Sequence, residues 1–454
     1  ICTDAGALAM LVTEHRYYPD VKMAAAFAIK AGINQFLDWD KEAVFGALAE
    51  GLLRVEEIDE AIKGSFRVMA KLGLLDPPDN NPYTFIGRID QEDPWNTEKH
   101  REIARIVTRK SIVLLKNENN FLPLNRKEIS SIAVIGPRAA EVLLDWYSGL
   151  PPYTVSPLEG IKDRVGRGVR VLYADGSDKE AAAATARACD VAVVCVGNHP
   201  TGNAGWAECP IPSDGKEAVD RKSITLEQEE LIKEVYRANK KTVVVLLASF
   251  PFAVCWTQHH VPAILHMTHN SQELGNALAE VLLGEVSPGG RLVQTWPRSI
   301  DQLPAMMDYD LHNGRTYMYF KGEPLYPFGH GLSYTCFAYH GLRTSSDVLQ
   351  KDGEITIDIT VKNIGPRTGE EVVQIYIKHL NSKVQRPLKE LKGFKRITLK
   401  PDEEKTVRFH LPSTALSYWD IDKGRFELEK EEIMIMVGSS SRNIRLEKII
   451  KVIG

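Results

Sequence analysis

The chain contains 454 residues, of which 44% are hydrophobic and 26% are charged, a composition typical of a globular protein with about two to four domains. Its formal net charge of −4 argues against a nucleic-acid partner or an anionic membrane, because both bind basic surfaces. No run of about 18 apolar residues is present, so the sequence predicts no membrane-spanning helix.

Six cysteines lie far apart in the sequence, and none belongs to a Cys-x-x-Cys pair. Disulfide frameworks are typical of short, cysteine-rich secreted chains. We therefore expect reduced thiols, which slightly favours a cytoplasmic location over secretion. The segment QHHVPAILHMTH holds four histidines, but it matches a strand followed by a loop, and we expect no metal ion there.

Residues 1–76 alternate between short apolar segments and helical patterns. The Ala-rich run over residues 20–32 predicts a helix that ends at Gly32, and residues 33–38 predict a short strand. Two further amphipathic helices are expected over residues 41–52 and 56–75. This pattern is typical of the last two units of a (β/α) barrel. Two units cannot close a barrel, so we expect upstream sequence or another chain to supply the rest.

The Pro- and Asn-rich residues 77–100 predict a linker, and a helix is expected over residues 96–117 with Asn96 or Thr97 as its N-cap. Within residues 101–335, helical patterns then separate short β-branched runs at residues 130–137, 170–176, 191–198, 242–249 and 263–269. Strands that alternate with helices predict an open, mostly parallel α/β sandwich domain. Such sheets bind ligands at the carboxyl ends of their strands.

From residue 336 to residue 454 the apolar residues alternate with a period of two, and turn residues separate the runs. This pattern predicts an antiparallel β-sandwich of the immunoglobulin or fibronectin type III kind. The sequence therefore predicts a multidomain α/β plus β protein.

Seven segments together resemble glycoside hydrolase family 3, and they occur in the order typical of that family. They are KSIVLLKNENNFLPL, LEQEELI, GNALAEVLLGEVSPGGRLVQTWP, GRTYMYF, PLYPFGHGLSYT, VKNIGPRTGEEVVQIYI and RPLKELKGFKRITL. The resemblance implies a (β/α) barrel, an α/β sandwich and a fibronectin-like domain. It also implies hydrolysis of β-glycosides from their ends, as by β-glucosidases and β-xylosidases, with no cofactor.

Asp4 lies in the segment CTDAGA, which is similar to the Ser-Asp-Trp-Gly-like motif of the family. That motif ends a late barrel strand and carries the catalytic nucleophile, so the resemblance assigns this role to Asp4. Ala5 stands where an aromatic residue is common. The alternative is that Asp4 caps the helix that follows it.

The partner acid is expected in the long polar loop after residue 198, at the end of a strand of the α/β domain. The segment EAVDRKSITL is similar to the family's Glu-x-x-Asp-Arg pattern, and this similarity assigns the acid/base role to Glu217. The alternative is a solvated charge paired with Lys216 or Arg221. Glu208 is the rival acid. We expect Asp220 and Arg221 to brace the loop through a salt bridge.

Three aromatic residues are candidate substrate contacts. Trp206 could stack on the flat apolar face of a sugar, or it could anchor the loop. Tyr147 and Tyr153 lie in a stretch where xylosidase-like members of the family carry a Gly-Asn-Tyr-x-Gly-x-Pro pattern, and either could line the leaving-group side. The alternative for both tyrosines is ordinary packing.

The resulting hypothesis is a retaining exo-β-glycosidase that removes non-reducing terminal β-D-glucose from oligosaccharides or glycosides. Retention requires two carboxyl groups about 5–5.5 Å apart, one ionised and one protonated. A β-xylosidase of the same family is the near alternative. A non-catalytic carbohydrate-binding remnant and a phosphorylase or transglycosylase are the others. The expected partner is a small-molecule β-glycoside, and the sequence leaves homo-oligomerisation open.

Overall fold

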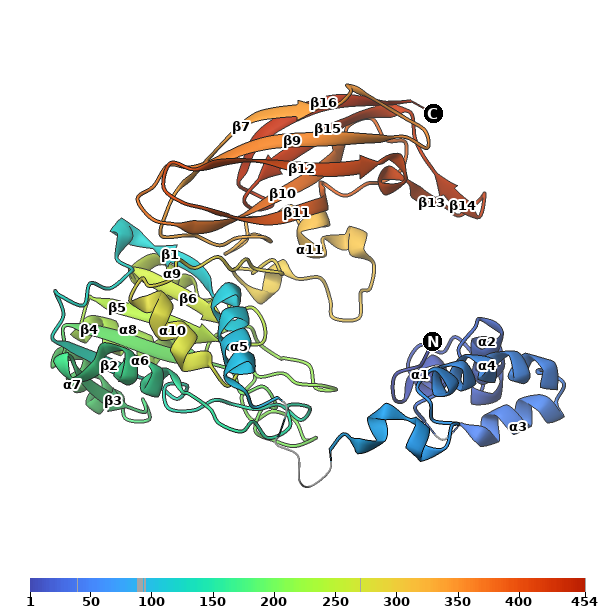
Figure 1. Cartoon of the computed structure of the whole chain (residues 1–454), viewed down its shortest axis with the longest axis horizontal. Helices are drawn as coiled ribbons and strands as arrows, with labels where there is room; N and C mark the ends of the chain where they lie inside the picture. Colours follow the sequence, from blue (N-terminus) through green and yellow to red (C-terminus); the bar gives the residue numbers. More distant parts are fainter. Residues whose placement is uncertain (39, 88–92, 94, 270, 454) are drawn as a thin grey trace. The chain divides into compact units, whose positions relative to one another are not determined.

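The structure is a computed structural model that describes residues 1–38, 40–87, 93, 95–269 and 271–453 (Figure 1). The chain divides into two compact units, residues 1–95 and residues 96–454. Within the described residues, no helix is both long and apolar enough to cross a membrane. All six cysteines are free thiols, as the sequence predicts.

The described residues of the first unit form four α-helices and two short extended segments. Its helices are α1 (Ala7–Thr13), α2 (Val21–Lys30), α3 (Lys41–Ala49) and α4 (Val55–Lys71), and 3₁₀ turns cover Pro78–Asn80 and Pro82–Phe85. Cys2 and Gln35 form a parallel bridge, and the Asn34 amide donates to the Ile1 carbonyl at 2.8 Å. Each extended segment therefore precedes a helix, as in neighbouring units of a (β/α) barrel.

Helix α2 forms the centre of this unit because its small side chains allow close packing. The Asp20 carboxylate caps it by accepting from the Met23 amide at 2.9 Å. Ala24, Ala25 and Ala26 are fully buried. Helix α4, by contrast, buries none of its residues, although its apolar residues recur with helical spacing.

The α/β part of the second unit is a six-stranded sheet in the order β1-β6-β5-β4-β2-β3. Its strands are β1 (Val113–Asn117), β2 (Ser131–Ile135), β3 (Arg170–Ala174), β4 (Val191–Gly197), β5 (Thr242–Leu247) and β6 (Ala263–Met267). Its helices are α5 (Glu98–Ser111), α6 (Pro157–Val165), α7 (Lys179–Arg187), α8 (Glu229–Ala238), α9 (Cys255–His260) and α10 (Leu274–Leu282). The five predicted strands are confirmed, although each ends one or two residues before the end of the predicted run, and all of them pair in parallel.

One sequence prediction is wrong in this region. The helix expected over residues 96–117 ends at Ser111, and Val113–Asn117 form β1, which pairs antiparallel with β6. Thr97 is the N-cap, because its hydroxyl accepts from the His100 amide. The apolar run after Ser111 is buried against the sheet, and this tertiary burial overrides the helical pattern that precedes it.

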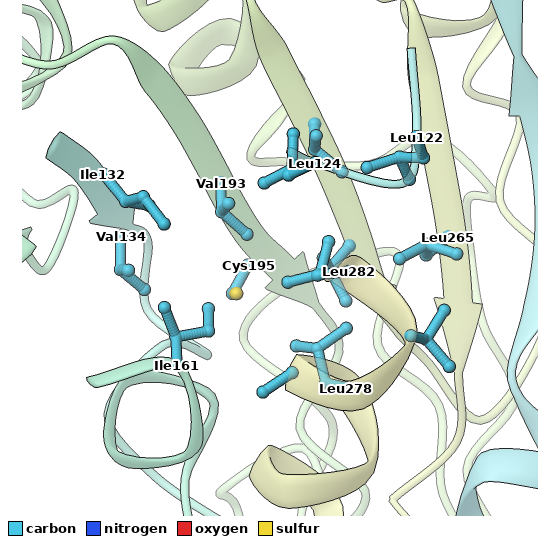
Figure 2. Packing of buried hydrophobic residues seen from close by; sticks show 14 of the residues in the cluster. Leu122, Leu124, Ile132, Val134, Ile161, Val193, Cys195, Leu265, Leu278 and Leu282 are labelled. Carbon is cyan, nitrogen blue, oxygen red and sulfur yellow. The ribbon is translucent and has the colours of Figure 1, made fainter. Parts of the chain in front are cut away.

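Two apolar clusters hold helices on the two faces of the sheet. On one face, Ile161 of α6 and Leu278 and Leu282 of α10 pack against strand residues such as Val193 and Leu265 (Figure 2). On the other face, α7 and α8 contribute side chains that include Ala182, Leu231 and Val235. Since the order of strands reverses between β2 and β4, the loops after these strands border the crevice where doubly wound sheets bind ligands.

The chain then passes through α11 (Thr316–Tyr319) into a β-sandwich, as predicted. One sheet has the order β11-β10-β15-β16-β8 and the other β12-β9-β7, while β13 and β14 form a separate hairpin (Figure 1). The strands are β7 (Phe337–Thr344), β8 (Val348–Gln350), β9 (Glu354–Asn363), β10 (Gly369–His379), β11 (Glu390–Leu399), β12 (Glu404–Pro412), β13 (Tyr418–Asp420), β14 (Arg425–Glu427), β15 (Glu431–Gly438) and β16 (Ile444–Ile453). Inward side chains of both sheets form one core.

Short 3₁₀ turns complete the second unit, at Glu118–Asn120, Gly166–Gly168, Ile300–Gln302, Leu311–Asn313 and Ser413–Leu416. The segment 300–315 between the sheet and α11 is otherwise irregular, and it lies beside the loop that carries the Glu-x-x-Asp-Arg pattern, because both line one cavity.

Candidate active site

Glu217 lies at the tip of a tight turn in the loop after β4. The backbones of Lys216 and Val219 exchange two hydrogen bonds of 3.1 Å, which leaves Glu217 and Ala218 as the connecting residues. Ala218 has a φ of 60°, a left-handed conformation that costs energy for any residue with a Cβ atom. The turn therefore projects the exposed Glu217 side chain away from the rest of the loop.

Tyr147 reaches this carboxylate from the loop after β2. Its hydroxyl donates to Glu217 Oε2 at 2.5 Å. An Asx turn positions the tyrosine, because the Asp145 carboxylate accepts from the Tyr147 amide at 2.8 Å. The loops on either side of the strand reversal, after β2 and after β4, thus meet at Glu217.

Two tryptophans lie beside the same turn. The rings of Trp146 and Trp206 are 4.3 Å apart between centroids and tilted by 36°. The Lys216 ammonium lies 5.9 Å from the centre of the Trp146 ring and donates to the Gly205 carbonyl. Trp206 is 68% exposed, so a face of this aromatic pair is available to a ligand next to the Glu217 turn.

Arg221 braces the loop, but not through the predicted salt bridge with Asp220. Its guanidinium donates to the carbonyls of Ser213 at 2.9 Å and Pro251 at 2.7 Å. It also packs 4.1 Å from the centre of the Phe250 ring. Burial lowers the pKa of Arg221 to about 10, so the side chain stays charged at neutral pH. The carbonyl oxygens of Ser213 and Pro251 accept the hydrogen bonds of the Arg221 guanidinium that we expected the Asp220 carboxylate to accept.

The rival acid, Glu208, has a different environment. The Lys222 ammonium donates to Glu208 Oε2 at 2.7 Å, and both side chains are exposed. This contact lowers the pKa of the Glu208 carboxyl. A general acid must retain its proton until it reaches the glycosidic oxygen, so the surroundings of Glu208 do not suit that role.

Tyr153 takes part in a separate polar contact. Its hydroxyl donates to the buried Glu273 carboxylate at 2.6 Å, and the Arg101 guanidinium lies 4.7 Å from the centre of its ring. Burial, followed by the bond to Glu273, raises the pKa of Tyr153. Of the two candidate tyrosines, only Tyr147 has a hydroxyl that bonds to Glu217.

Asp4 follows the extended residues 1–3 of the first unit and is exposed. Its Oδ1 accepts from the Ala5 amide at 2.8 Å. The N-cap of α1 is Gly6, with a φ of 72° and no side-chain cap, so Asp4 does not cap this helix. The strand-to-helix turn positions the Asp4 side chain, which does not cap the helix.

Two further acids in the first unit were not predicted from the sequence. Asp38 ends the second extended segment, and its Oδ2 accepts from the Gly6 amide at 2.5 Å. Burial, followed by the charge of Asp38, raises the pKa of Asp40. The sequence contains a signal for Asp38, because the predicted strand INQFLD ends in an acid, just as the segment CTD does. Neighbouring parallel strands bring their carboxyl ends together, so these two acids are expected to lie close to each other.

His266 is buried in β6, and His269 follows that strand. Burial lowers the pKa values of both His266 and His269 to about 4. The His266 ring bonds to the Leu246 carbonyl at 3.3 Å. No group of three His, Cys, Asp or Glu side chains that could hold a metal ion occurs in the described part of the chain.

We compared the sequence and the structure of the chain with known proteins and protein families. The model of the glycosyl hydrolase family 3 C-terminal domain matches residues 112–334, and that of the fibronectin type III-like domain matches residues 371–441. A β-xylosidase of Formosa agariphila is 34% identical over 97% of this chain and 63% of its own length. A periplasmic β-glucosidase of Salmonella typhimurium is 32% identical over 98% of this chain and 62% of its own length.

Solved structures agree with these relatives. A β-glucosidase from Erythrobacter marinus matches with a TM-score of 0.83 and 30% identity, over 100% of this chain and 63% of its own. A β-glucosidase from Listeria innocua in complex with glucose matches with a TM-score of 0.81 and 27% identity, over 100% and 63% of the two chains. The chain thus spans less than two thirds of the length of each of these four relatives, and it belongs to glycoside hydrolase family 3.

Proposed function

We propose that this chain carries both catalytic carboxyl groups of a retaining exo-β-glycosidase that releases terminal β-D-glucose. The observation that supports the proposal most directly is the Glu217 turn, where a carboxylate, the Tyr147 hydroxyl and an exposed tryptophan pair converge. A sugar is recognised by such a combination of flat apolar surface and polar groups.

In the proposed mechanism Asp4 is the nucleophile and Glu217 the acid/base. Asp4 attacks the anomeric carbon while Glu217 gives its proton to the glycosidic oxygen, and the leaving group departs as an alcohol. Glu217 then takes a proton from water, and the resulting attack releases the sugar and regenerates Asp4. The net anomeric configuration is retained because two displacements occur at the same carbon.

The remaining expectations become parts of this proposal. Trp206 and Tyr147 contact the substrate on the acid/base side. The proposed domains are residues 1–76, the end of a (β/α) barrel, then the linker 77–100, the α/β sandwich 101–335 and the fibronectin type III-like domain 336–454. Upstream sequence or another chain completes the barrel, which agrees with the uncovered apolar residues of α4.

A β-xylosidase is the second candidate, because one of the relatives described above bears that name. Glucose differs from xylose by a hydroxymethyl group, so one side chain in the sugar pocket can exclude it. Comparing kcat/KM for 4-nitrophenyl β-D-glucoside and β-D-xyloside with the complete polypeptide distinguishes the two activities.

The roles of the acids are tested with substrates that differ in leaving group. In Glu217→Ala, kcat/KM for cellobiose should fall by about 10²–10⁴, while a 2,4-dinitrophenyl glucoside, which needs no protonation, should suffer far less. Azide should restore turnover of the dinitrophenyl glucoside, because azide replaces water as the nucleophile that attacks the glycosyl-enzyme and needs no general base. Glu208→Ala is the matched control and should behave like the unmodified protein. If Glu208→Ala shows the azide rescue instead, Glu208 is the acid.

The nucleophile is tested by Asp4→Asn in the complete polypeptide. The substitution keeps the size of the side chain and removes the attacking charge, so turnover should be abolished for glucosides with either good or poor leaving groups. A near-normal rate in Asp4→Asn would remove Asp4 from this role. A protein that binds glucosides but hydrolyses none, with Asp4 and Glu217 intact, would instead be the non-catalytic remnant.

A further inference from the structure

A continuous groove lies under the irregular segment 303–315 of the second unit. Two cavities of about 770 and 570 Å³ form it, each within the size range of small-molecule sites. The cavities adjoin each other, since they share five lining residues: Arg221, Ile224, Leu303, Pro304 and Arg315. We call this feature the 303–315 groove.

The larger cavity begins at the turn that carries the candidate acid. Lys216 and Val219, the two residues that close the Glu217–Ala218 turn, both line it. The other cavity continues from the shared residues toward α11, where Tyr317 and Phe320 line it. The groove therefore leads away from the position at which Glu217 would protonate a glycosidic oxygen.

The cationic side chains of the groove are already engaged by the protein. The Arg315 guanidinium donates to the carbonyls of Ala305 at 2.7 Å, Met306 at 3.1 Å and Asp308. The Lys216 ammonium donates to the Gly205 carbonyl, and Arg221 donates to two carbonyls as described above. These charges hold the loops around the groove rather than being directed at a ligand.

What the groove offers instead is apolar surface. Ile300, Leu303 and Met306 are 45%, 49% and 56% exposed, and Leu311 is 45% exposed, although all four line the groove. Exposed apolar side chains gathered in a concave surface mark a binding site for an apolar group. A second sugar would bring hydroxyl groups that need hydrogen-bond partners. Among the described lining residues, Thr295 Oγ1 and Arg221 Nη2 are buried without such a partner, but the lining is mostly apolar and matches a hydrocarbon group better.

We propose that the 303–315 groove binds an extended apolar leaving group, so that the preferred substrates are β-glycosides of alkyl or arylalkyl alcohols. This inference rests on the proposed hydrolase function, because the leaving group is the one that Glu217 protonates. The hydroxyl end of the alcohol lies at the Glu217 turn, and its hydrocarbon chain extends past Leu303 toward Leu311.

The test compares glucosides of methanol, butanol and octanol below their micelle-forming concentrations, with the complete polypeptide. We expect kcat/KM to rise with chain length, by up to about fourfold for each methylene that enters the groove. Met306→Asp should lower the octyl-to-methyl ratio at least tenfold, and Leu303→Asp should act in the same direction. Met307→Asp is the matched control, since Met307 does not line either cavity and is 73% exposed.

Binding is measured separately by calorimetry with the non-hydrolysable octyl and methyl β-D-thioglucosides. A Kd for the octyl compound that is at least tenfold lower, and a loss of this difference in Met306→Asp but not in Met307→Asp, supports the groove even without turnover. If all the glucosides are hydrolysed with a kcat/KM that does not depend on chain length, the proposal for the groove is wrong and the proposed hydrolase function stands. Chain-length-dependent binding without any hydrolysis overturns the hydrolase instead.

One outcome identifies a competing occupant. If residues 1–454 alone bind the octyl compound more tightly than the methyl compound, and the complete polypeptide does not, the upstream segment of the protein covers the groove. That result also overturns the proposal.

Discussion

The Tyr147 hydroxyl and the Glu217 carboxylate form a hydrogen bond of 2.5 Å between residues 70 positions apart in the sequence. Neither loop alone explains this contact. The loop after β2 supplies the tyrosine and the loop after β4 supplies the acid, and these strands are neighbours in the sheet. This hydrogen bond restricts the orientation of the acid before a substrate arrives.

Removing this donor tests whether Tyr147 positions the acid. In Tyr147→Phe we expect kcat/KM for substrates with poor leaving groups to fall about three- to tenfold, because one exposed hydrogen bond to the acid is lost. The effect on a 2,4-dinitrophenyl glucoside should be smaller, since that substrate does not depend on proton donation. Tyr153→Phe is the control, because its hydroxyl bonds to Glu273. Equal effects of the two substitutions would contradict a role for Tyr147 at Glu217.

Asp38 is expected to hold the turn that carries Asp4. Its carboxylate accepts from the Gly6 amide, two residues after Asp4. Asp38→Ala removes the acceptor, so kcat should fall about tenfold with little change in KM, as for a lost hydrogen bond to a charged acceptor. Asp38→Asn retains an oxygen acceptor and should recover most of the rate. If kcat falls equally in Asp38→Ala and Asp38→Asn, the charge of Asp38 and not its hydrogen bond to Gly6 supports the rate.

Glu280 is expected to be important for folding and not for chemistry. Its side chain is 6% exposed and accepts from Arg109 at 3.0 Å and from Arg164, on helices α5 and α6. Glu280→Ala removes these hydrogen bonds between charged groups, although Arg109 keeps Glu102 and Arg164 keeps Glu285 as partners, so the free energy of unfolding should fall by about 1.5–3 kcal/mol.

Urea unfolding of the second unit, followed by tryptophan fluorescence, measures this loss. The control is Glu230→Ala, which breaks an exposed pair with Lys233 within α8 and should cost less than about 0.5 kcal/mol. If Glu280→Ala and Glu230→Ala lower the free energy of unfolding by similar amounts, the contacts of Glu280 with α5 and α6 contribute little to stability.

Asp190 is expected to make stability depend on pH at the acidic end. It accepts hydrogen bonds from the amides and hydroxyls of Ser130 and Ser131, which lower its pKa to about 2. Because the folded pKa is below the unfolded value of about 3.9, the stabilisation is complete above about pH 5 and is lost as pH falls from about 4 to 2.

The comparison of Asp190→Asn with the unmodified protein isolates this contribution. The urea midpoint of the variant should be lower at pH 7 and should approach that of the unmodified protein at pH 2.5, where the aspartate is mostly protonated in the unfolded state. A difference in midpoint that does not change with pH would exclude a role for the ionised carboxylate.

The sequence by itself determined five of the six strands of the α/β sheet and the β-sandwich character of the C-terminal residues. The run 191–197 is entirely apolar because both faces of a central parallel strand are buried, whereas residues 354–363 alternate because one face of a sandwich strand meets water. It also indicated Asp4 and Glu217 through their resemblance to family motifs. It could not separate α5 from β1, since a helical pattern continues directly into an apolar run that fits either structure.

Only the tertiary structure decided which side chains surround each candidate. Three contacts join residues that are far apart in sequence: the bond from Tyr147 to Glu217, the bond from Arg221 to the Pro251 carbonyl and the contact of Asp38 with Gly6. Local propensity depends on the spacing of neighbouring residues, whereas these contacts depend on the order of strands in the sheet and on the loops after them. That order results from burying both faces of the sheet together, which no single segment specifies.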